Sequence, residues 1–360
     1  MEKLKVGLGS RSYPIVIGSG CLRLIPQALK ETWRAGRYCL VSDNKVAKQY
    51  GEALRKMIVD AGLRCDLLVF EQGEENKNLT TIAALASRAA RLGLDRTSMF
   101  IACGGGVTGD ITGFLASIYM RGLSFIQVPT SLLAQVDSSV GGKTGVDIPE
   151  GKNLVGTFHQ PKAVFIDTDV LKTLPETEYL SGMAEVIKHG IIRDRDFFHF
   201  LVRERQNILA LREPQLTRVI YDCCRIKAEV VSADEREGNI RRILNFGHTI
   251  GHAVEAGSGF TLSHGFAVAI GMVAATRIAV NKGFVDETVL SEIYVFLTKC
   301  GLPTEIPAAL DRKEMMSYLL ADKKNIDGRH IFILPKAIGD VCISDEVTDR
   351  DIDRVFAESG

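Results

Sequence analysis

Short runs rich in β-branched and aromatic residues alternate with helical patterns from the N-terminus to about Leu174. The strand-like runs are YCLVSD, CDLLVF, SMFIACGG, SFIQVPT and AVFIDT, and the clearest helical pattern spans residues 78–92. Strand-like runs separated by helical patterns are typical of βαβ units. The first half of the chain is therefore predicted to form an α/β domain around a parallel sheet.

The hydrophobic pattern changes after the turn signal at residues 173–175. Long amphipathic segments dominate residues 179–299, and one strand-like run, HIFILP, follows near the end. This pattern predicts a second, mainly helical domain. A chain of 360 residues also exceeds what one hydrophobic core usually supports. We predict an α/β domain over residues 1–176 and a mainly helical domain over residues 177–360.

The composition narrows the class of protein. Hydrophobic residues make up 46% of the chain, and 44 Lys and Arg balance 44 Asp and Glu, so no bulk attraction to nucleic acid or to an anionic membrane is expected. The start, MEKLKVGLGS, lacks an apolar signal region, and the longest apolar stretch, residues 265–276, is too short to span a bilayer before Arg277. The eight cysteines show no C-x-x-C spacing, which indicates reduced core residues. We expect a cytoplasmic protein.

Three of the seven histidines gather in one stretch. His248 and His252 lie four residues apart in LNFGHTIGHAVE, and His264 follows in LSHG. Residues at i and i+4 share one face of a helix, so the first two imidazoles can reach one divalent metal. Position 249 is Thr where zinc hydrolases with this spacing carry a Glu general base, so hydrolysis is not predicted. The alternative is a helix that carries unrelated histidines.

A glycine loop, CGGGVTGD at residues 103–110, follows an apolar strand and precedes a helical pattern. Bare backbone at such a turn, together with a helix N-terminus, suits a pyrophosphate. The loop matches G-x-G-x-x-G, but no acidic residue follows about 20 residues later, so a plain tight turn stays open. Asp43, at the end of YCLVSD, could bind a ribose diol and so favour NAD, or could cap a helix.

The densest polar stretch is residues 128–153, VPTSLLAQVDSSVGGKTGVDIPEGKN. Lys143 and Lys152, with nearby hydroxyls and Asp137, suit an anionic small molecule rich in hydroxyls. A solvated, flexible loop is the alternative. Lys188 falls three residues after Glu185, on the same helical face. The sequence also contains further cations at Lys188, Lys227 and Arg241. Each of them, considered alone, is better interpreted as part of a solvated helix face.

Seven sequence blocks in order resemble one known family. The blocks are GGGVTGD, VPTSLLAQVDSSVGGKTGVD, GKNLVGTFHQP, MAEVIKHG, LNFGHTIGHAVE, LSHG and DKKN, and together they closely resemble the 3-dehydroquinate synthase family of the shikimate pathway. The resemblance implies a Rossmann-like N-terminal domain, a helical C-terminal domain, bound NAD, one Zn²⁺ or Co²⁺, and a homodimer. The implied reaction converts 3-deoxy-D-arabino-heptulosonate 7-phosphate to 3-dehydroquinate and phosphate. Alternatives are a sister sugar phosphate cyclase such as 2-deoxy-scyllo-inosose synthase, or a metal-dependent polyol dehydrogenase.

The resemblance also implies the roles of individual residues. The metal ligands fall on Glu185, His248 and His264, whereas His252 faces the substrate phosphate instead of the metal. Arg121 reaches the phosphate in the neighbouring subunit, and a C-terminal phosphate ligand is expected in DKKN, at Lys324 with Lys323 as the alternative. Substrate contacts fall on Asp137, Lys143, Lys152, Asn153, Lys188, Lys227, Arg241, Asn245 and His252.

The same resemblance implies a set of NAD contacts. They fall on Asp43, Glu74, Lys77, Gly106, Val107, Thr108, Gly109, Asp110, Thr130, Ser131, Asp137, Lys143, Leu171, Lys172 and Thr173. Three positions depart from the family pattern. Ser131 stands where a second Thr is common, Asp147 where Asn is common, and His159 where Tyr is usual. No departure removes a charged catalytic group, and the charge added by Asp147 has no explanation in the sequence.

Overall fold

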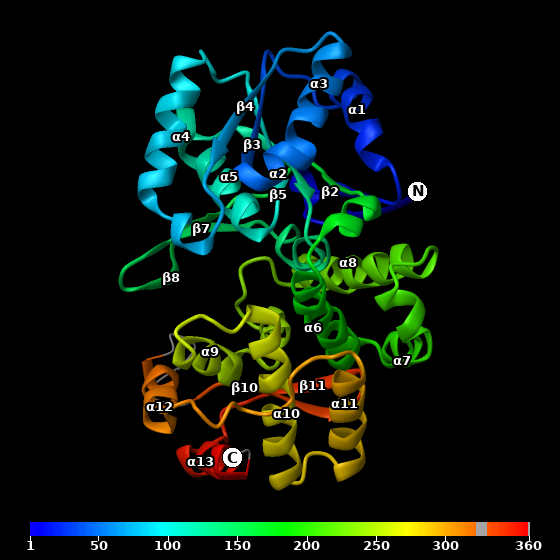
Figure 1. Cartoon of the computed structure of the whole chain (residues 1–360), viewed down its shortest axis with the longest axis vertical. Coiled ribbons are helices and arrows are strands. Elements are labelled where there is room, and N and C mark those ends of the chain that lie inside the picture. The colour runs from blue at the N-terminus through cyan, green and yellow to red at the C-terminus, as the bar shows by residue number, and fades with distance from the viewer. Residues whose placement is uncertain (322–329, 359–360) are drawn as a thin grey trace. The chain divides into compact units, whose positions relative to one another are not determined.

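A computed structural model describes residues 1–321 and 330–358, which form two compact units. The α/β unit comprises Met1–Leu174 and Lys227–Arg236, and the helical unit comprises Pro175–Ile226 and Glu237–Gly360. Figure 1 shows helices around a sheet in the first unit, and mainly helices with one small sheet in the second. The predicted fold class, a parallel α/β domain followed by a mainly helical one, is confirmed. The assignment of NAD binding to residues 1–176 and of metal binding to residues 177–360 stays a prediction.

A seven-stranded sheet forms the centre of the α/β unit, in the order β1-β2-β9-β6-β5-β3-β4. β1 is antiparallel to β2, and the other neighbouring strands are parallel. The strands are β1 (Glu2–Val6), β2 (Tyr13–Ile17), β3 (Tyr38–Asp43), β4 (Cys65–Phe70), β5 (Met99–Gly104), β6 (Ser124–Pro129) and β9 (Val164–Ile166). Each of the five predicted runs contains one of the parallel strands β3, β4, β5, β6 and β9.

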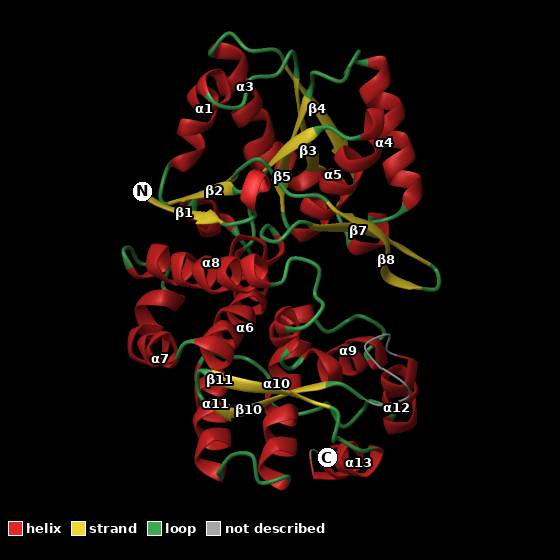
Figure 2. Ribbon diagram, turned by 180° about the vertical axis from the view of Figure 1, so that it is seen from behind, coloured by secondary structure: helices red, strands yellow, loops and turns green. Residues whose placement is uncertain are grey.

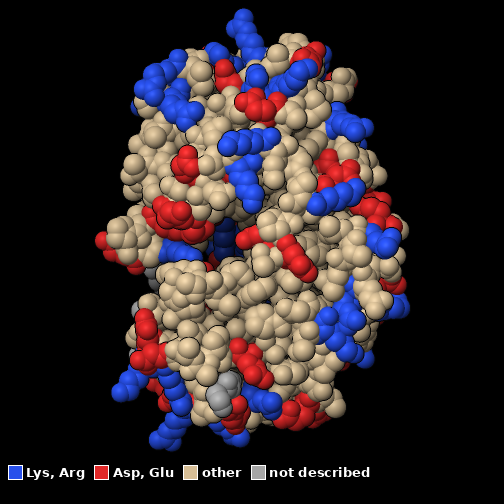
Figure 3. Space-filling view, viewed as in Figure 1, with Lys and Arg blue, Asp and Glu red and all other residues tan. Residues whose placement is uncertain are grey.

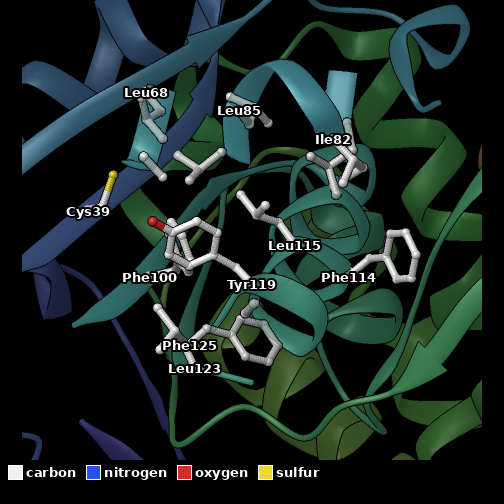
Figure 4. Packing of buried hydrophobic residues seen from close by; sticks show 14 of the residues in the cluster. Cys39, Leu68, Ile82, Leu85, Phe100, Phe114, Leu115, Tyr119, Leu123 and Phe125 are labelled. Carbon is white, nitrogen blue, oxygen red and sulfur yellow. The ribbon is translucent and has the colours of Figure 1, made fainter. Parts of the chain in front are cut away.

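Alternate side chains of the strands enter two separate cores. Leu40 on β3 and Ile101 on β5 pack with α1 (Ile25–Glu31) and α3 (Glu52–Asp60). Cys39, Phe100 and Phe125 point to the opposite face and pack with α4 (Leu79–Arg91) and α5 (Gly106–Ile118), as Figure 4 shows. Successive residues of a strand point to opposite faces, so a strand covered on both sides is apolar throughout. This explains why the runs in the sequence are continuous and do not alternate.

The polar stretch at residues 128–153 contains half of a two-stranded hairpin. β7 (Lys143–Ile148) pairs with β8 (Gly151–Phe158) in an antiparallel arrangement. Val146 on β7 is fully buried and belongs to the same core as α4 and α5. The alternative of a flexible, solvated loop is therefore wrong for residues 143–148. The hairpin carries Lys143, Lys152 and Asn153 of this stretch.

The helical unit is built around α10 (His264–Asn281), which packs on α6 (Glu176–Arg193) and α9 (His248–Gly257). The other elements, seen from behind in Figure 2, are α7 (Arg195–Leu209), α8 (Gln215–Ala233), α11 (Glu287–Lys299), α12 (Arg312–Ala321), α13 (Asp349–Glu358), β10 (Phe332–Ala337) and β11 (Asp340–Ser344). The last residues of α8 group with the α/β unit. HIFILP supplies most of β10, as predicted.

One described helix, α10, is long and apolar enough to cross a membrane, and 67% of its span is buried inside the protein. Burial of this kind is typical of a core helix, because the apolar side chains already have protein neighbours. On the face drawn in Figure 3, Lys and Arg side chains are interspersed with Asp and Glu in each unit. This distribution agrees with the balanced charge of the sequence.

Candidate functional site

Three helices of the helical unit bring Glu185, His248 and His264 together. Glu185 lies in the middle of α6, and each histidine is the first residue of its own helix, α9 or α10. The Nε2 atoms of His248 and His264 lie 3.6 and 3.7 Å from Oε1 of Glu185. α10 approaches α6 closely because residue 265 is glycine: a Cβ there would lie 1.9 Å from the carbonyl oxygen of Ser181. A larger side chain would push His264 away from Glu185.

The other ring nitrogen of each histidine already has an acceptor. Nδ1 of His248 lies 3.1 Å from the carbonyl oxygen of Phe246, and Nδ1 of His264 lies 3.0 Å from Oε2 of Glu255. An acceptor at Nδ1 means that this nitrogen carries the proton of a neutral imidazole, which leaves Nε2 with its lone pair. Both lone pairs then sit beside Glu185. This arrangement is the usual one for histidines that bind a metal.

One carboxylate oxygen of Glu185 is available to a cation. The side chain is 1% exposed, and Lys188, one turn later, forms an ion pair with Oε2. Within the described part of the chain, Oε1 accepts no hydrogen bond, and a buried carboxylate oxygen without a partner is costly. Burial alone would lower the pKa of His264, but the hydrogen bond to Glu255 and the charge of Glu185 outweigh it and raise the pKa. The donor set of one carboxylate and two imidazoles fits a divalent metal such as Zn²⁺.

His252 adds a second geometric possibility. The ligand atoms of His248, His252 and His264 all lie within 4.8 Å of one another. The rings of His248 and His252 are 5.3 Å apart, so the i, i+4 spacing brings them to one face of α9 as the sequence predicted. The geometry therefore allows either three histidines or Glu185 with two histidines. Only the second set uses Oε1 of Glu185, the oxygen that lies beside both Nε2 atoms.

Two further predicted residues of this unit lie in the segment before α9. Arg241 and Asn245 belong to the 3-10 helix η8 (Ile240–Asn245). Arg241 is 2% exposed, and Nδ2 of Asn245 donates to Oε1 of Glu237 at 2.8 Å. Lys324 lies outside the described residues.

The α/β unit places Asp43 and the glycine loop at a topological switch point. The chain leaves β3 toward β4 on one side, and β5 then pairs with β3 on the other side. In open parallel sheets, ligands bind outside the carboxyl ends of the strands where the strand order reverses. Asp43 ends β3 and the glycine loop follows β5, so both lie at this point. The loop therefore meets the position of a dinucleotide site although it does not lie in the first βαβ unit.

The glycine loop leads into α5 without a side-chain cap. Gly105 is the N-cap residue and has no side chain that could cap the helix. The first N–H groups of a helix lack partners within it and bind anions readily. A Cβ at Gly104 would lie 2.2 Å from Oγ1 of Thr108, so this position requires glycine. The loop has the form predicted for a pyrophosphate cradle, and its binding of phosphate stays a prediction.

Asp43 caps a helix, as one of the two alternatives predicted. Its Oδ1 accepts from the backbone N–H groups of Lys45 and Val46 at 3.0 and 2.9 Å. The other oxygen, Oδ2, lies 3.4 Å from Oγ1 of Thr108 in the glycine loop. The cap uses one oxygen only, so the ribose role stays a prediction compatible with it.

Lys77 is the centre of a buried polar cluster. Its Nζ lies 2.7 Å from Oδ2 of Asp110, 2.6 Å from Oδ1 of Asn153 and 3.6 Å from Oε1 of Glu74. Burial raises the pKa of Asp110 above its usual range although Lys77 opposes the shift. Burial would lower the pKa of Lys77, but Asp110 and Glu74 outweigh it and raise the pKa. Four predicted residues from three separate parts of the sequence thus form one network.

Asp147 holds the hairpin in the form that presents Asn153. Its Oδ1 accepts from the backbone N–H of Asn153 at 2.6 Å, and Asn153 has a positive φ of 55°. A residue in this left-handed conformation costs energy unless its surroundings hold it there. An aspartate can supply this acceptor oxygen as an asparagine would, so the departure at Asp147 keeps the hydrogen bond, and this contact does not explain the added charge.

Lys227 and Asp137 form a second pair within the α/β unit. Nζ of Lys227 lies 2.6 Å from Oδ1 and 2.7 Å from the carbonyl oxygen of Asp137.

Arg121 lies in a strained turn, because Met120, Arg121 and Gly122 have φ values of 49°, 67° and 120°. The other predicted residues lie as follows: Thr130 and Ser131 after β6, Lys143 at the start of β7, Lys152 on β8, and Leu171, Lys172 and Thr173 in the 3-10 helix η7 (Thr168–Thr173).

Sequence reasoning missed Glu255 as a member of the candidate metal site. It lies seven residues after His248 in the motif already recognised, and residues at i and i+7 share a helix face. That period was a signal that could have found it. Its contact with His264 could not be predicted in this way, because His264 lies on a different helix and no helical period relates the two residues.

The chain matches both halves of one protein family. Residues 67–181 match the family 3-dehydroquinate synthase N-terminal, and residues 182–325 match 3-dehydroquinate synthase C-terminal. Among curated relatives, the 3-dehydroquinate synthase of Thermodesulfovibrio yellowstonii is 45% identical over 359 residues, which cover 99% of this chain and 100% of the relative.

Two solved structures of related cyclases have the same fold. 2-Deoxy-scyllo-inosose synthase, in complex with carbaglucose-6-phosphate, NAD⁺ and Co²⁺, is 29% identical with a TM-score of 0.90 and covers 100% of both chains. 2-epi-5-epi-Valiolone synthase from Streptomyces hygroscopicus subsp. jinggangensis, with NAD⁺ and Zn²⁺ bound, is 28% identical with a TM-score of 0.89 and covers 98% of both chains.

Proposed function

Because the chain belongs to the 3-dehydroquinate synthase family, we infer that it converts 3-deoxy-D-arabino-heptulosonate 7-phosphate to 3-dehydroquinate and phosphate. It is a phosphate-eliminating cyclase of the shikimate pathway, and so an enzyme of aromatic amino-acid biosynthesis. The observation that carries this conclusion is 45% identity to a 3-dehydroquinate synthase across nearly the whole chain. The sister activity, 2-deoxy-scyllo-inosose synthesis, is the second candidate, and the lower identity of 29% disfavours it.

We propose that Glu185, His248 and His264 hold a divalent metal, Zn²⁺ or Co²⁺. Support comes from the two Nε2 atoms beside Oε1 of Glu185 and from the lack of a hydrogen bond to this buried oxygen among the described residues. The Zn²⁺ and Co²⁺ bound by the two related cyclases add to this support. His252 then lies beside the ligands as a group that contacts the substrate phosphate and moves protons.

We propose that NAD binds at the switch point of the α/β unit. Asp43 supplies its second carboxylate oxygen to the ribose, and the uncapped start of α5 receives the pyrophosphate. The Lys77 network fixes Asp110 and Asn153 at the same loop and hairpin. The remaining NAD contacts are those assigned from the family pattern: Glu74, Gly106 to Gly109, Thr130, Ser131, Asp137, Lys143 and Leu171 to Thr173.

Each group then has a part in the reaction. Bound NAD supplies reversible hydride transfer, and a bound divalent metal supplies Lewis acidity toward substrate hydroxyls. Lys152, Asn153, Lys188, Lys227, Arg241, Asn245 and His252 bind and orient the substrate, and Lys324 completes the phosphate site. A site rich in cations positions a dianion and stabilises the charge that develops as phosphate leaves. The substrate's own phosphate oxygen serves as the base, so few protein bases are required.

We further propose a cytoplasmic homodimer in which Arg121 reaches the phosphate bound by its neighbour. The strained turn at residues 120–122 supports this proposal. Met120 and Arg121 both have positive φ angles, and such strained residues other than glycine are often found at functional sites.

The test of the function is a phosphate-release assay with absorbance at 340 nm followed alongside. We expect phosphate from the heptulosonate phosphate without net accumulation of NADH, since the hydride is returned. Exhaustive chelation should abolish release, and added Zn²⁺ or Co²⁺ should restore it. Glucose 6-phosphate, which resembles the ligand of the inosose synthase complex, is the control substrate. Turnover of the control instead would assign the chain to the sister activity, and full activity without metal would refute the metal site.

A further inference from the structure

Glu255 contacts the ring nitrogen of His264 that does not face Glu185. Its Oε2 lies 3.0 Å from Nδ1, while Nε2 of the same ring lies 3.7 Å from Oε1 of Glu185. The residue is 7% exposed. A buried carboxylate on one side of an imidazole fixes the ring and makes the opposite nitrogen a better electron donor.

The two histidines beside Glu185 differ in the acceptor at Nδ1. His248 donates to the carbonyl oxygen of Phe246, which is neutral and belongs to the backbone, whereas the acceptor for His264 is an acidic side chain. Hydrogen bonds to an ionised acceptor are stronger than those to a neutral one. The geometry therefore makes the orientation and basicity of His264 depend on residue 255.

We propose that Glu255 is a positioning residue that orients His264 and, through its charge, increases the affinity of this site for a divalent metal. This inference rests on the proposed role of His264 as a ligand. Glu255 itself does not touch the substrate or the metal in this arrangement. Its effect passes through the imidazole.

A purely structural role must be separated from the proposed one. Glu255 lies near the end of α9 and His264 begins α10, so their contact also joins the two helices. Glu255→Gln keeps a side-chain oxygen that can accept the hydrogen bond but removes the charge. Glu255→Ala removes both. Glu292→Gln is the matched control, because Glu292 contacts His199 at 3.2 Å in the same unit and both side chains are about two-fifths exposed.

The experiment measures metal binding to the full chain. The Zn²⁺ dissociation constant is obtained by competition with a chelating dye, the Co²⁺ site is followed by its visible absorption spectrum, and thermal unfolding of the metal-free protein is the check on folding. We expect the affinity of Glu255→Ala to fall about 10- to 100-fold. Glu255→Gln should lose less and keep the wild-type unfolding temperature, and Glu292→Gln should match the wild type throughout.

The outcomes separate this inference from the proposed function. If the wild-type chain bound neither metal at one ion per chain, the proposed metal site would fail first. If the wild type bound metal and Glu255→Gln bound it equally well with an unchanged Co²⁺ spectrum, the charge of Glu255 would have no role and the inference would be overturned. If Glu255→Ala unfolds, the folded Glu255→Gln variant decides between these results.

Discussion

Lys77→Met tests the buried network of the α/β unit. The side chain of Lys77 is 5% exposed, and its ion pair with Asp110 spans 2.7 Å. Removing one partner of a buried ion pair costs about 3–5 kcal/mol, because the other charge stays buried without compensation. Asp110 keeps 21% of its side chain exposed, so water offsets part of this cost. We expect the free energy of unfolding to fall by about 3 kcal/mol at neutral pH, near the lower end of that range.

The single tryptophan of the chain makes the measurement specific to this unit. Trp33 packs against Phe165 with ring centroids 5.7 Å apart, and both residues belong to the α/β unit. Urea denaturation of the apo protein, followed by Trp33 fluorescence, therefore reports the unit that contains Lys77. With a urea dependence of about 2 kcal/mol per M, the transition midpoint should fall by about 1.5 M.

The effect of Lys77→Met should also depend on pH. Asp110 has a pKa raised by burial in the folded state, so its ionised form reduces stability as pH rises through that pKa, and Lys77 offsets this loss. The pKa of Lys77 is raised as well, so its contribution is complete below the ordinary lysine pKa of 10.5 and is lost above it. The destabilisation should therefore be smallest below the ordinary aspartate pKa of 3.8 and should grow as the pH rises above it.

Two controls decide whether charge burial is the cause. Lys56→Met removes an exposed pair with Asp60 in the same unit and should cost less than about 1 kcal/mol. Lys77→Met combined with Asp110→Asn removes both charges and should recover much of the loss. The reasoning would be refuted if Lys77→Met unfolded at the same urea concentration as Lys56→Met.

Three further predictions concern the candidate sites. Glu185→Gln removes the ligand charge and should lower the metal content of the purified protein at least about tenfold with unchanged circular dichroism, and normal metal content would move the third ligand elsewhere. Gly104→Ala places a Cβ 2.2 Å from Thr108 and should weaken NAD binding, measured by calorimetry, at least about tenfold, whereas unchanged affinity would argue against the cradle. Arg121→Ala mixed with Lys152→Ala should regain activity after subunit exchange, because one site of each heterodimer is intact, and a mixture no more active than its parents would show that Arg121 does not serve its neighbour.

Local periodicity was enough to predict much of the fold. The strands β3, β4, β5, β6 and β9 each fall within predicted runs, because a strand covered on both faces must be apolar at every position. The helix that carries His248 and His252 also follows from spacing alone, since i and i+4 meet on one face in any α-helix. These features depend only on neighbours in the sequence.

The order of motifs identified the family, and with it the proposed set of metal ligands, which spacing alone could not distinguish from other sets. Spacing favoured His248 and His252 as the pair that binds metal. The family pattern placed the third ligand on Glu185, more than 60 residues earlier, and the structure brings Glu185 within 3.7 Å of both His248 and His264. The order of motifs could therefore suggest which residues meet, but it could not give the distances between them.

Tertiary structure alone decided the contacts made across elements. The pairing of β5 with β3 brings the glycine loop beside Asp43, and strand order depends on packing between distant segments rather than on any local pattern. The acceptor that Asp147 offers to Asn153 depends on the turn of a hairpin, and the contact of Glu255 with His264 depends on how α9 meets α10. A sequence period specifies which face a side chain occupies, but the residue opposite that face is chosen by the fold.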